Sequence, residues 1–244
     1  MQKCFEHFFF CFISDKWAQF QGAAICSTIE LMTKKLHDVP FVENPDDRCT
    51  VAVIGMVLSY FMPERHFAMP ELETICGYEK GRSIWKALSM LNLVKLGFQV
   101  YWIEDFDHQK FMADPRGYLR TILDDEAYEW QVTHGNLDQE ARRIRQYIKD
   151  GLPLERRRAT DADVKRFLDD SWLVHLEVNA NTLSGKTGYE GHSILVMGYN
   201  DAGATIHNPD GVNGNKPNQH VSWGLLDRAW KEFGGSYSLY AFKK

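Results

Sequence analysis

The sequence predicts an α+β domain in which helices precede most of the strands. Residues 49–61 form a nearly unbroken apolar run after a turn-rich segment, and a run of this length favours a buried helix over a strand. Three shorter runs rich in aliphatic and aromatic residues, at 172–178, 193–199 and 237–242, are typical of strands. A chain of 244 residues is long enough to bury a core without disulfide cross-links.

Amphipathic patterns, together with residues that typically begin or end helices, predict the elements between these runs. Apolar residues at helical spacing predict a helix over 84–97 that ends at a glycine, and a strand follows over 98–103. Residues 114–150 predict two helices, and Asp138 opens the second. Residues 160–163 resemble a capping box with Asp in the place of Glu, which predicts a short helix directly before the strand-like runs.

The composition limits the classes of partner. A net charge of −5 gives no general attraction to nucleic acid or to an anionic membrane. Five cysteines, an odd number without a CxxC pair, argue against a disulfide framework and against structural zinc. Residues 183–187 end like a phosphate-binding P-loop, but Ala180 stands where that motif requires glycine. We therefore expect no nucleic-acid partner, no metal and no cofactor.

The N-terminal residues lack the regular hydrophobic pattern of the rest of the chain. The apolar run at 8–13 is much shorter than the roughly 20 residues of a membrane span, and Glu6 and Asp15 interrupt the pattern of a signal peptide. We therefore separate a poorly patterned leader, residues 1–36, from one domain over 37–244 and expect no membrane span. The expected location is cytoplasmic, with secretion left open by the apolar run, and the sequence does not indicate an oligomeric state.

Cys49 is the first candidate for chemistry because it follows the turn at 44–47 and opens the predicted buried helix. The N-terminus of a helix carries a partial positive charge, which favours a thiolate. A thiol in this position can act as a nucleophile near neutral pH when a histidine lies nearby. The alternative interpretation is a small buried apolar residue, which is the most common role of a free cysteine.

His192 is the second candidate because it stands at the start of an apolar strand, after a loop rich in Gly, Ser and Thr. The strand turns at 200–203 and returns through 205–207 to Asn208 and Asp210. This hairpin brings the last two residues back toward His192, and a carboxamide or carboxylate beside a histidine can fix its tautomer and orientation.

The register of the hairpin decides which residue becomes the partner of His192. A two- or four-residue loop places His192 on the same face as His207. A three-residue loop or a bulge sets Asp210 opposite His192 and puts Asn208 on the same face, and Gly203 is compatible with a bulged turn. Both registers remain open from the sequence.

These segments resemble a known family. The similarity is to papain-like cysteine peptidases akin to bacteriocin-leader-processing peptidases. It rests on residues 38–49, the apolar helix, the run Gly-His-Ser-Ile-Leu-Val-Met-Gly-Tyr-Asn at 191–200, and Asn208 before a proline. The resemblance covers about 39–244, with 62–160 only loosely matched. It implies a papain-like α+β fold in which the helix that bears the nucleophile packs on an antiparallel sheet.

The resemblance also implies an activity. A thiol protease, or cysteine-dependent amide hydrolase, would cleave a peptide or amide bond through a thioester acyl-enzyme formed on a catalytic triad. Cys49 would be the nucleophile, His192 the base and then the acid, and Asn208 the orienting residue, with Asp210 as the alternative third residue.

Two positions depart from the family pattern. Glu43 stands where the family has a glutamine that donates to the oxyanion, and an ionised carboxylate can only accept hydrogen bonds and repels negative charge. Loss of one such donor costs on the order of 10²–10³ in rate. Thr50 stands where a glycine often follows the cysteine. A catalytically impaired papain-like binding domain and an acyl transferase on the same fold are therefore kept as alternatives.

Overall fold

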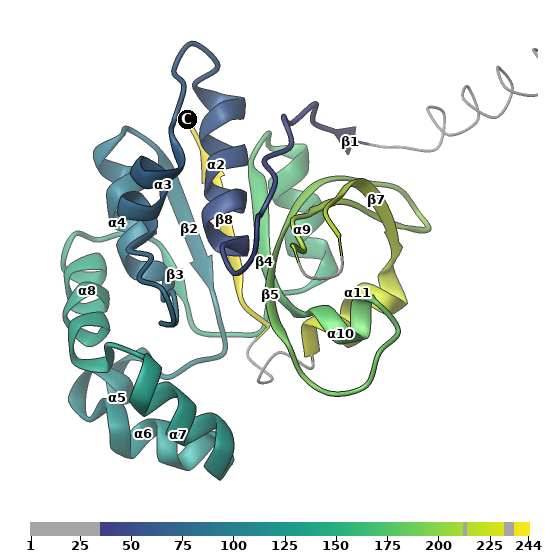
Figure 1. The fold of residues 1–244 in the computed structure, drawn as a ribbon. Helices are drawn as coiled ribbons and strands as arrows, with labels where there is room; N and C mark the ends of the chain where they lie inside the picture. The colour runs from purple at the N-terminus through teal and green to yellow at the C-terminus, as the bar shows by residue number, and fades with distance from the viewer. Residues whose placement is uncertain (1–34, 212–213, 232–236) are drawn as a thin grey trace, which may run out of the picture.

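One twisted sheet runs through the molecule, and helices cover both of its faces (Figure 1). The computed structural model describes residues 35–211, 214–231 and 237–244. Most of the predicted leader, residues 1–34, lies outside these ranges, together with Cys4, Cys11 and Cys26. None of the helices in the described ranges combines the length and the apolar composition that crossing a membrane requires.

Most of the described helices precede most of the strands along the chain, as the α+β prediction requires. The helices are α2 (Cys49–Phe61), α3 (Met69–Cys76), α4 (Lys86–Lys95), α5 (His108–Ala113), α6 (Pro115–Ile122), α7 (Asp125–His134), α8 (Leu137–Lys149), α9 (Asp161–Asp169), α10 (Ala180–Leu183) and α11 (Trp223–Lys231). The strands are β1 (Lys35–Leu36), β2 (Gln99–Ile103), β3 (Leu154–Glu155), β4 (Leu173–Asn179), β5 (Gly191–Tyr199), β6 (Gly203–Asn208), β7 (Lys216–Ser222) and β8 (Leu239–Lys243).

The strands join in the order β3-β2-β8-β4-β5-β6-β7, and β1 pairs with β5 beside this path. All of these pairings are antiparallel except that of β2 with β3, which is parallel. The α+β class is therefore confirmed, with the helix that begins at Cys49 packed on a largely antiparallel sheet. The domain division at residue 36 stays a prediction, although Lys35–Leu36 pair with Tyr199 and Gly198.

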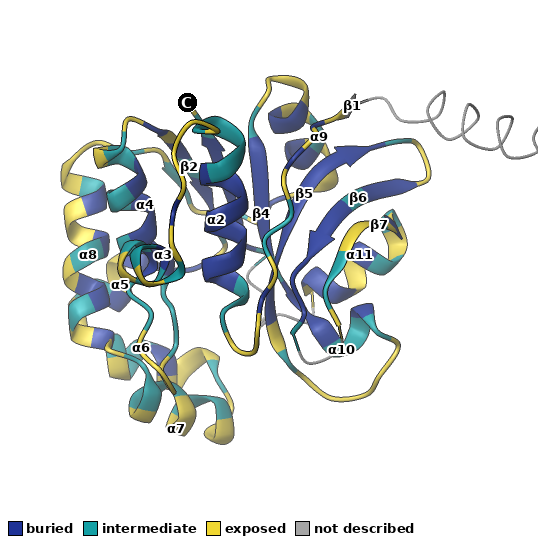
Figure 2. Cartoon of the chain, turned by 45° about the horizontal axis from the view of Figure 1, so that its top comes forward, coloured by how far each residue is buried: buried dark blue, intermediate teal, exposed yellow. Residues whose placement is uncertain are grey.

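The helix α2 is buried on every side because residues 50–58 are all shielded from solvent between the sheet and the helices α3 and α4 (Figure 2). Side chains of the strands alternate between two cores, as the period of two in a strand requires. In β5, Leu195 and Met197 join the core around α2, while Ile194 and Val196 join the core under α9 and α11.

The prediction of two helices over 114–150 is wrong, because three helices occupy this segment. The side chain of Asp124 accepts a hydrogen bond from the backbone N–H of Ala127 at 2.8 Å, so it caps a new helix, α7, in the middle of the range. The last helix, α8, begins at Leu137, one residue before the expected Asp138. The capping box at 160–163 forms as predicted, with Thr160 and Asp163 bonded reciprocally.

The hairpin β5–β6 combines both registers that the sequence left open. Near the turn Tyr199 pairs with Ala204, as a four-residue loop dictates. A bulge between Val196 and Gly198 then shifts the pairing, so that Leu195 lies opposite His207. A bulge leaves one extra residue unpaired and changes the register beyond it. The shift brings Asn208 to the face of the hairpin on which His192 lies.

Candidate functional site

The loop before α2 holds Cys49 at the start of the helix. Asn44 is buried in this loop, and its side-chain oxygen accepts hydrogen bonds from the backbone N–H groups of Asp46 at 3.3 Å and of Arg48 at 2.9 Å. These bonds fix the backbone that enters the helix. The N-terminus of α2 has no side-chain cap in the described part of the chain, so the partial positive charge of the helix lies at the half-buried Cys49.

The same loop is docked on the end of the hairpin β5–β6. The side-chain nitrogen of Asn44 donates to the backbone oxygen of Pro209 at 2.9 Å. The backbone N–H of Asn44 donates to the Asn215 side chain at 3.0 Å, and Asn215 donates back to the Asn44 backbone oxygen at 3.1 Å. Gly211 packs directly on the loop, because a Cβ atom there would lie 2.8 Å from the backbone oxygen of Asn44. The docking fixes the start of α2 against the residues that follow Asn208.

His192 and Asn208 form a buried hydrogen-bonded pair. The Nε2 atom of His192 lies 2.7 Å from the side-chain oxygen of Asn208. The Asn208 side-chain nitrogen donates to the side-chain oxygen of Gln219 in β7 at 3.0 Å, so the amide is oriented with its oxygen toward the histidine. Nε2 therefore carries a proton and donates. The ring also hydrogen-bonds the thiol of Cys49, which leaves Nδ1 for that contact.

The pKa values of the thiol and of the imidazole move toward each other. Burial alone would raise the pKa of Cys49, but the hydrogen bond and charge of His192, the charge of Lys86 and the backbone N–H of Ser193 lower it to about 7. Burial alone would lower the pKa of His192, but the bonds to Cys49 and Asn208 raise it above its ordinary value. The geometry thus favours a thiolate beside an imidazolium, and near pH 7 a substantial part of the thiol is ionised.

The structure brings together three of the predicted site residues, places Asp210 close to them and leaves Glu43 apart. Cys49, His192 and Asn208 form one connected chain of hydrogen bonds. Asp210 is buried nearby and acts on His192 through its charge, whereas the hydrogen bond to Nε2 belongs to Asn208. Glu43 is exposed, and its carboxylate has no hydrogen bond or ion pair within the described residues.

Two further side chains support the site and were not predicted. Gln219 fixes the Asn208 amide, and no sequence signal pointed to it because β7 was not recognised as a strand. Lys86 lies buried at the first position of α4 and hydrogen-bonds the Thr50 hydroxyl at 3.1 Å. Thr50, one of the two departures from the family pattern, therefore has a defined partner. The other described cysteine, Cys76, is buried in apolar surroundings that raise the pKa of its thiol to about 12, so it stays a thiol.

Comparisons with known proteins give matches among solved structures only. No protein-family model matches the chain, and no curated protein gives a significant sequence match. A double glycine motif protease from an AMS/PCAT transporter, solved in complex with the leader peptide, is 12% identical with a TM-score of 0.45, over 87% of this chain and 96% of the other. A chain named as a C39-like peptidase from Bacillus anthracis has the same identity and TM-score, 12% and 0.45, over 87% and 98%.

A third similar structure is the peptidase domain of Streptococcus ComA, a bifunctional ABC transporter involved in a quorum-sensing pathway. It is 15% identical with a TM-score of 0.40, over 86% of this chain and 98% of the other. All three chains are named as proteases, peptidases or peptidase domains, the class that the sequence motifs resemble.

The docking of the loop on the hairpin predicts the effect of a small substitution. Gly211→Ala would place a Cβ atom within 3.0 Å of the backbone of Asp46 and closer still to Asn44, so either the loop or the hairpin must shift. We expect the free energy of unfolding to fall by about 1–3 kcal/mol. Because Cys49 moves away from His192, we also expect its alkylation by iodoacetamide at pH 7 to slow.

Gly224→Ala is the matched control. Gly224 lies in α11 with no atom within 4 Å of the added Cβ, so stability should stay unchanged or rise by up to about 1 kcal/mol. Chemical denaturation measures both variants. Equal stability of Gly211→Ala and the wild type would show that the loop does not depend on this close contact.

Proposed function

We propose that this chain is a cysteine peptidase or amide hydrolase that acts through a Cys-His-Asn triad. The observation that carries the proposal is the buried chain of hydrogen bonds from the Cys49 thiol through the His192 ring to the Asn208 side chain. A nucleophile at hydrogen-bonding distance from a base, which is itself oriented by a third group, is the arrangement that covalent catalysis requires.

The reaction that fits this arrangement has two halves. The Cys49 thiolate attacks the carbonyl carbon of a peptide or amide bond, and a C–S bond forms as the carbonyl oxygen becomes an oxyanion. The C–N bond then breaks, and the leaving amine takes the proton from the His192 imidazolium. In the second half His192 removes a proton from water, the water attacks the thioester, and the acid product leaves as the C–S bond breaks.

The developing oxyanion needs hydrogen-bond donors. We assign this role to the backbone N–H at the start of α2, where the helix has no side-chain cap in the described part of the chain. The helix dipole adds to this stabilisation because its positive end lies at Cys49. No second donor is supplied by position 43, where an exposed carboxylate stands.

Cleavage of a peptide mixture tests the proposal. The full chain is incubated with peptides from a digested proteome, and new termini are identified by mass spectrometry. We expect cleavage products that disappear in Cys49→Ala. We also expect Asn208→Ala to reduce cleavage more than Asp210→Ala does, because Asn208 makes the hydrogen bond to His192. The absence of any Cys49-dependent product would contradict the peptidase proposal.

The exposed carboxylate of Glu43 favours a second candidate function, a papain-like domain that binds peptides without cleaving them. The two functions differ in the expected effect of Glu43→Gln. If the triad is competent and the carboxylate only weakens oxyanion binding, the substitution adds a neutral donor and raises the cleavage rate by up to about 10²–10³. A binding domain gives no turnover in either form.

The matched control is Asp47→Asn, which removes another exposed carboxylate from the same loop. We expect it to leave the rate close to that of the wild type. A rate for Glu43→Gln no higher than that of the control would show that position 43 does not face the oxyanion.

A further inference from the structure

A buried cation lies next to the candidate site. Lys86, at the first position of α4, is only 5% exposed, which is rare for lysine unless the ammonium is paired. Its Nζ atom donates to the Thr50 hydroxyl at 3.1 Å and to the backbone oxygen of Ile84 at 3.2 Å, and it forms an ion pair with Glu177 in β4. The three partners fix the position of the ammonium.

The hydrogen bonds connect this ammonium to residues on both sides of the site. Thr50 directly follows Cys49 in α2, and its hydroxyl lies 2.8 Å from the hydroxyl of Ser193, which directly follows His192 in β5. Both hydroxyls are buried. A chain of hydrogen bonds therefore runs from Lys86 through Thr50 to Ser193, where α2 meets the sheet. It passes one residue after Cys49 and one residue after His192.

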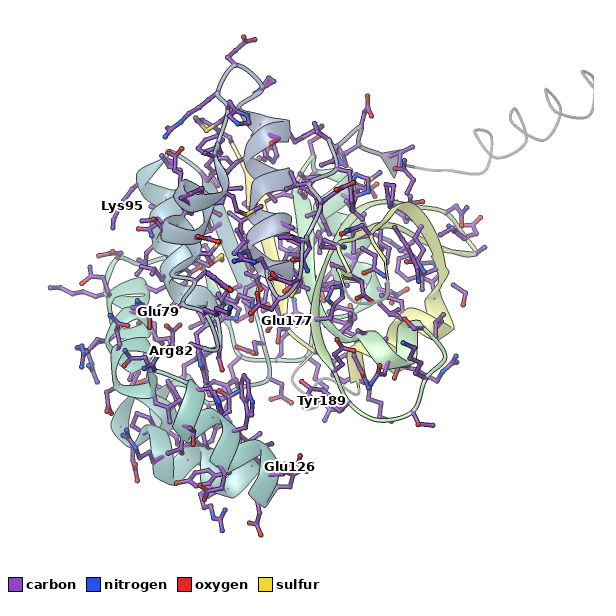
Figure 3. The ribbon with its side chains drawn as sticks, viewed as in Figure 1. Glu79, Arg82, Lys95, Glu126, Glu177 and Tyr189 are labelled. Carbon is purple, nitrogen blue, oxygen red and sulfur yellow. The ribbon has the colours of Figure 1, made fainter. Side chains whose placement is uncertain are left out.

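The negative partner of Lys86 lies in the sheet, where Glu177 of β4 is opposite Ser193 of β5. The second carboxylate oxygen of Glu177 is 3.4 Å from the hydroxyl of Tyr240, and the charge of Glu177 raises the pKa values of Glu104 and Tyr240. Among the charges that lower the pKa of Cys49 are that of His192 and, after it, that of Lys86. Figure 3 shows Glu177, a residue of β4, near the lower end of α2, which is the end that begins at Cys49. Through its bond to Thr50, the ammonium of Lys86 thus lies beside the first turn of α2, which begins at Cys49.

Burial shifts two other carboxyl groups near Lys86 toward their neutral forms. Burial, followed by the charge of Glu177, raises the pKa of Glu104 to about 8, so Glu104 is largely protonated at pH 7. Burial likewise raises the pKa of Glu140 and lowers that of His175, which keeps His175 neutral. The groups on neighbouring elements that sense the charge of Lys86 are Cys49 (α2), Cys76 (α3), Glu104 (after β2), Glu140 (α8) and His175 (β4).

We propose that Lys86 is a positioning residue of the candidate site, whose buried ammonium stabilises the thiolate of Cys49. The inference rests on Cys49 being the nucleophile of the proposed reaction, and it deepens that proposal by adding a second cation to the imidazolium of His192. It also gives Thr50 a role, because the threonine hydroxyl joins the ammonium to the turn of α2 that carries the nucleophile. A glycine at this position could not make that bond.

The pH dependence of Cys49 alkylation tests the role of Lys86. The full chain reacts with iodoacetamide at a series of pH values, and modification of Cys49 is followed by peptide mass spectrometry, which separates it from the other cysteines. Lys86→Met removes the charge at similar side-chain length. A nearby opposite charge typically changes a pKa by about one unit or more, so the midpoint should rise by about one pH unit and the rate at pH 6 should fall about tenfold.

Three companion variants separate charge from packing. Lys86→Arg keeps a cation and should keep the midpoint near that of the wild type. Lys95→Met makes the same change at the exposed end of α4 and should have no effect (Figure 3). Because Lys86→Met leaves Glu177 without its partner and can unfold the chain, the double variant Lys86→Met with Glu177→Gln removes both charges together.

The double variant decides the outcome. A folded double variant whose Cys49 midpoint matches the wild type would overturn the proposal, and a rise of about one unit supports it. The assay contains no peptide substrate, so its result is independent of cleavage. A shifted midpoint in a chain that cleaves nothing would leave Lys86 in this role while removing the proposed hydrolase activity.

Discussion

The contact between the loop that leads into α2 and the end of the hairpin β5–β6 is the constraint on which the site depends. Cys49, the proposed nucleophile, lies on a helix of the first half of the chain. His192 and Asn208, the proposed base and its partner, lie on strands of the second half. Asn44 joins these parts because it bonds the backbone of its own loop and the backbone oxygen of Pro209. A shift of this contact would separate Cys49 from His192 even if each element kept its internal structure.

A second constraint comes from the polar groups buried between α2, α4 and the sheet. An isolated ammonium or carboxylate in this region would be strongly destabilising, so the ion pair of Lys86 with Glu177 and the hydroxyls of Thr50 and Ser193 require one another. Thr50 and Ser193 directly follow Cys49 and His192, so the hydrogen bond between their hydroxyls holds the start of α2 against the start of β5.

The sequence predicted the class of fold and the three residues that the site brings together. Cys49 and His192 occupy local contexts that short-range rules describe, whereas Asn208 was taken from the family resemblance. Cys49 follows a turn and opens a buried helix, and His192 begins an apolar strand. The register of Asn208 was left open because the bulge between Val196 and Gly198 lies within an apolar strand that gives no local signal for it. Lys86 and Gln219 were missed because their partners are distant in the chain, and no periodic pattern encodes such contacts.

The coupling between Cys49 and His192 is the central claim, and the titration of the His192 ring measures it directly. Imidazole chemical shifts of histidine-labelled protein are followed against pH in the wild type and in Cys49→Ala, with the His192 signal assigned from His192→Gln. Since burial lowers the pKa of this ring and Cys49 raises it, the midpoint should lie above the ordinary value in the wild type and fall in Cys49→Ala. Identical midpoints in the two proteins would contradict a thiolate–imidazolium pair.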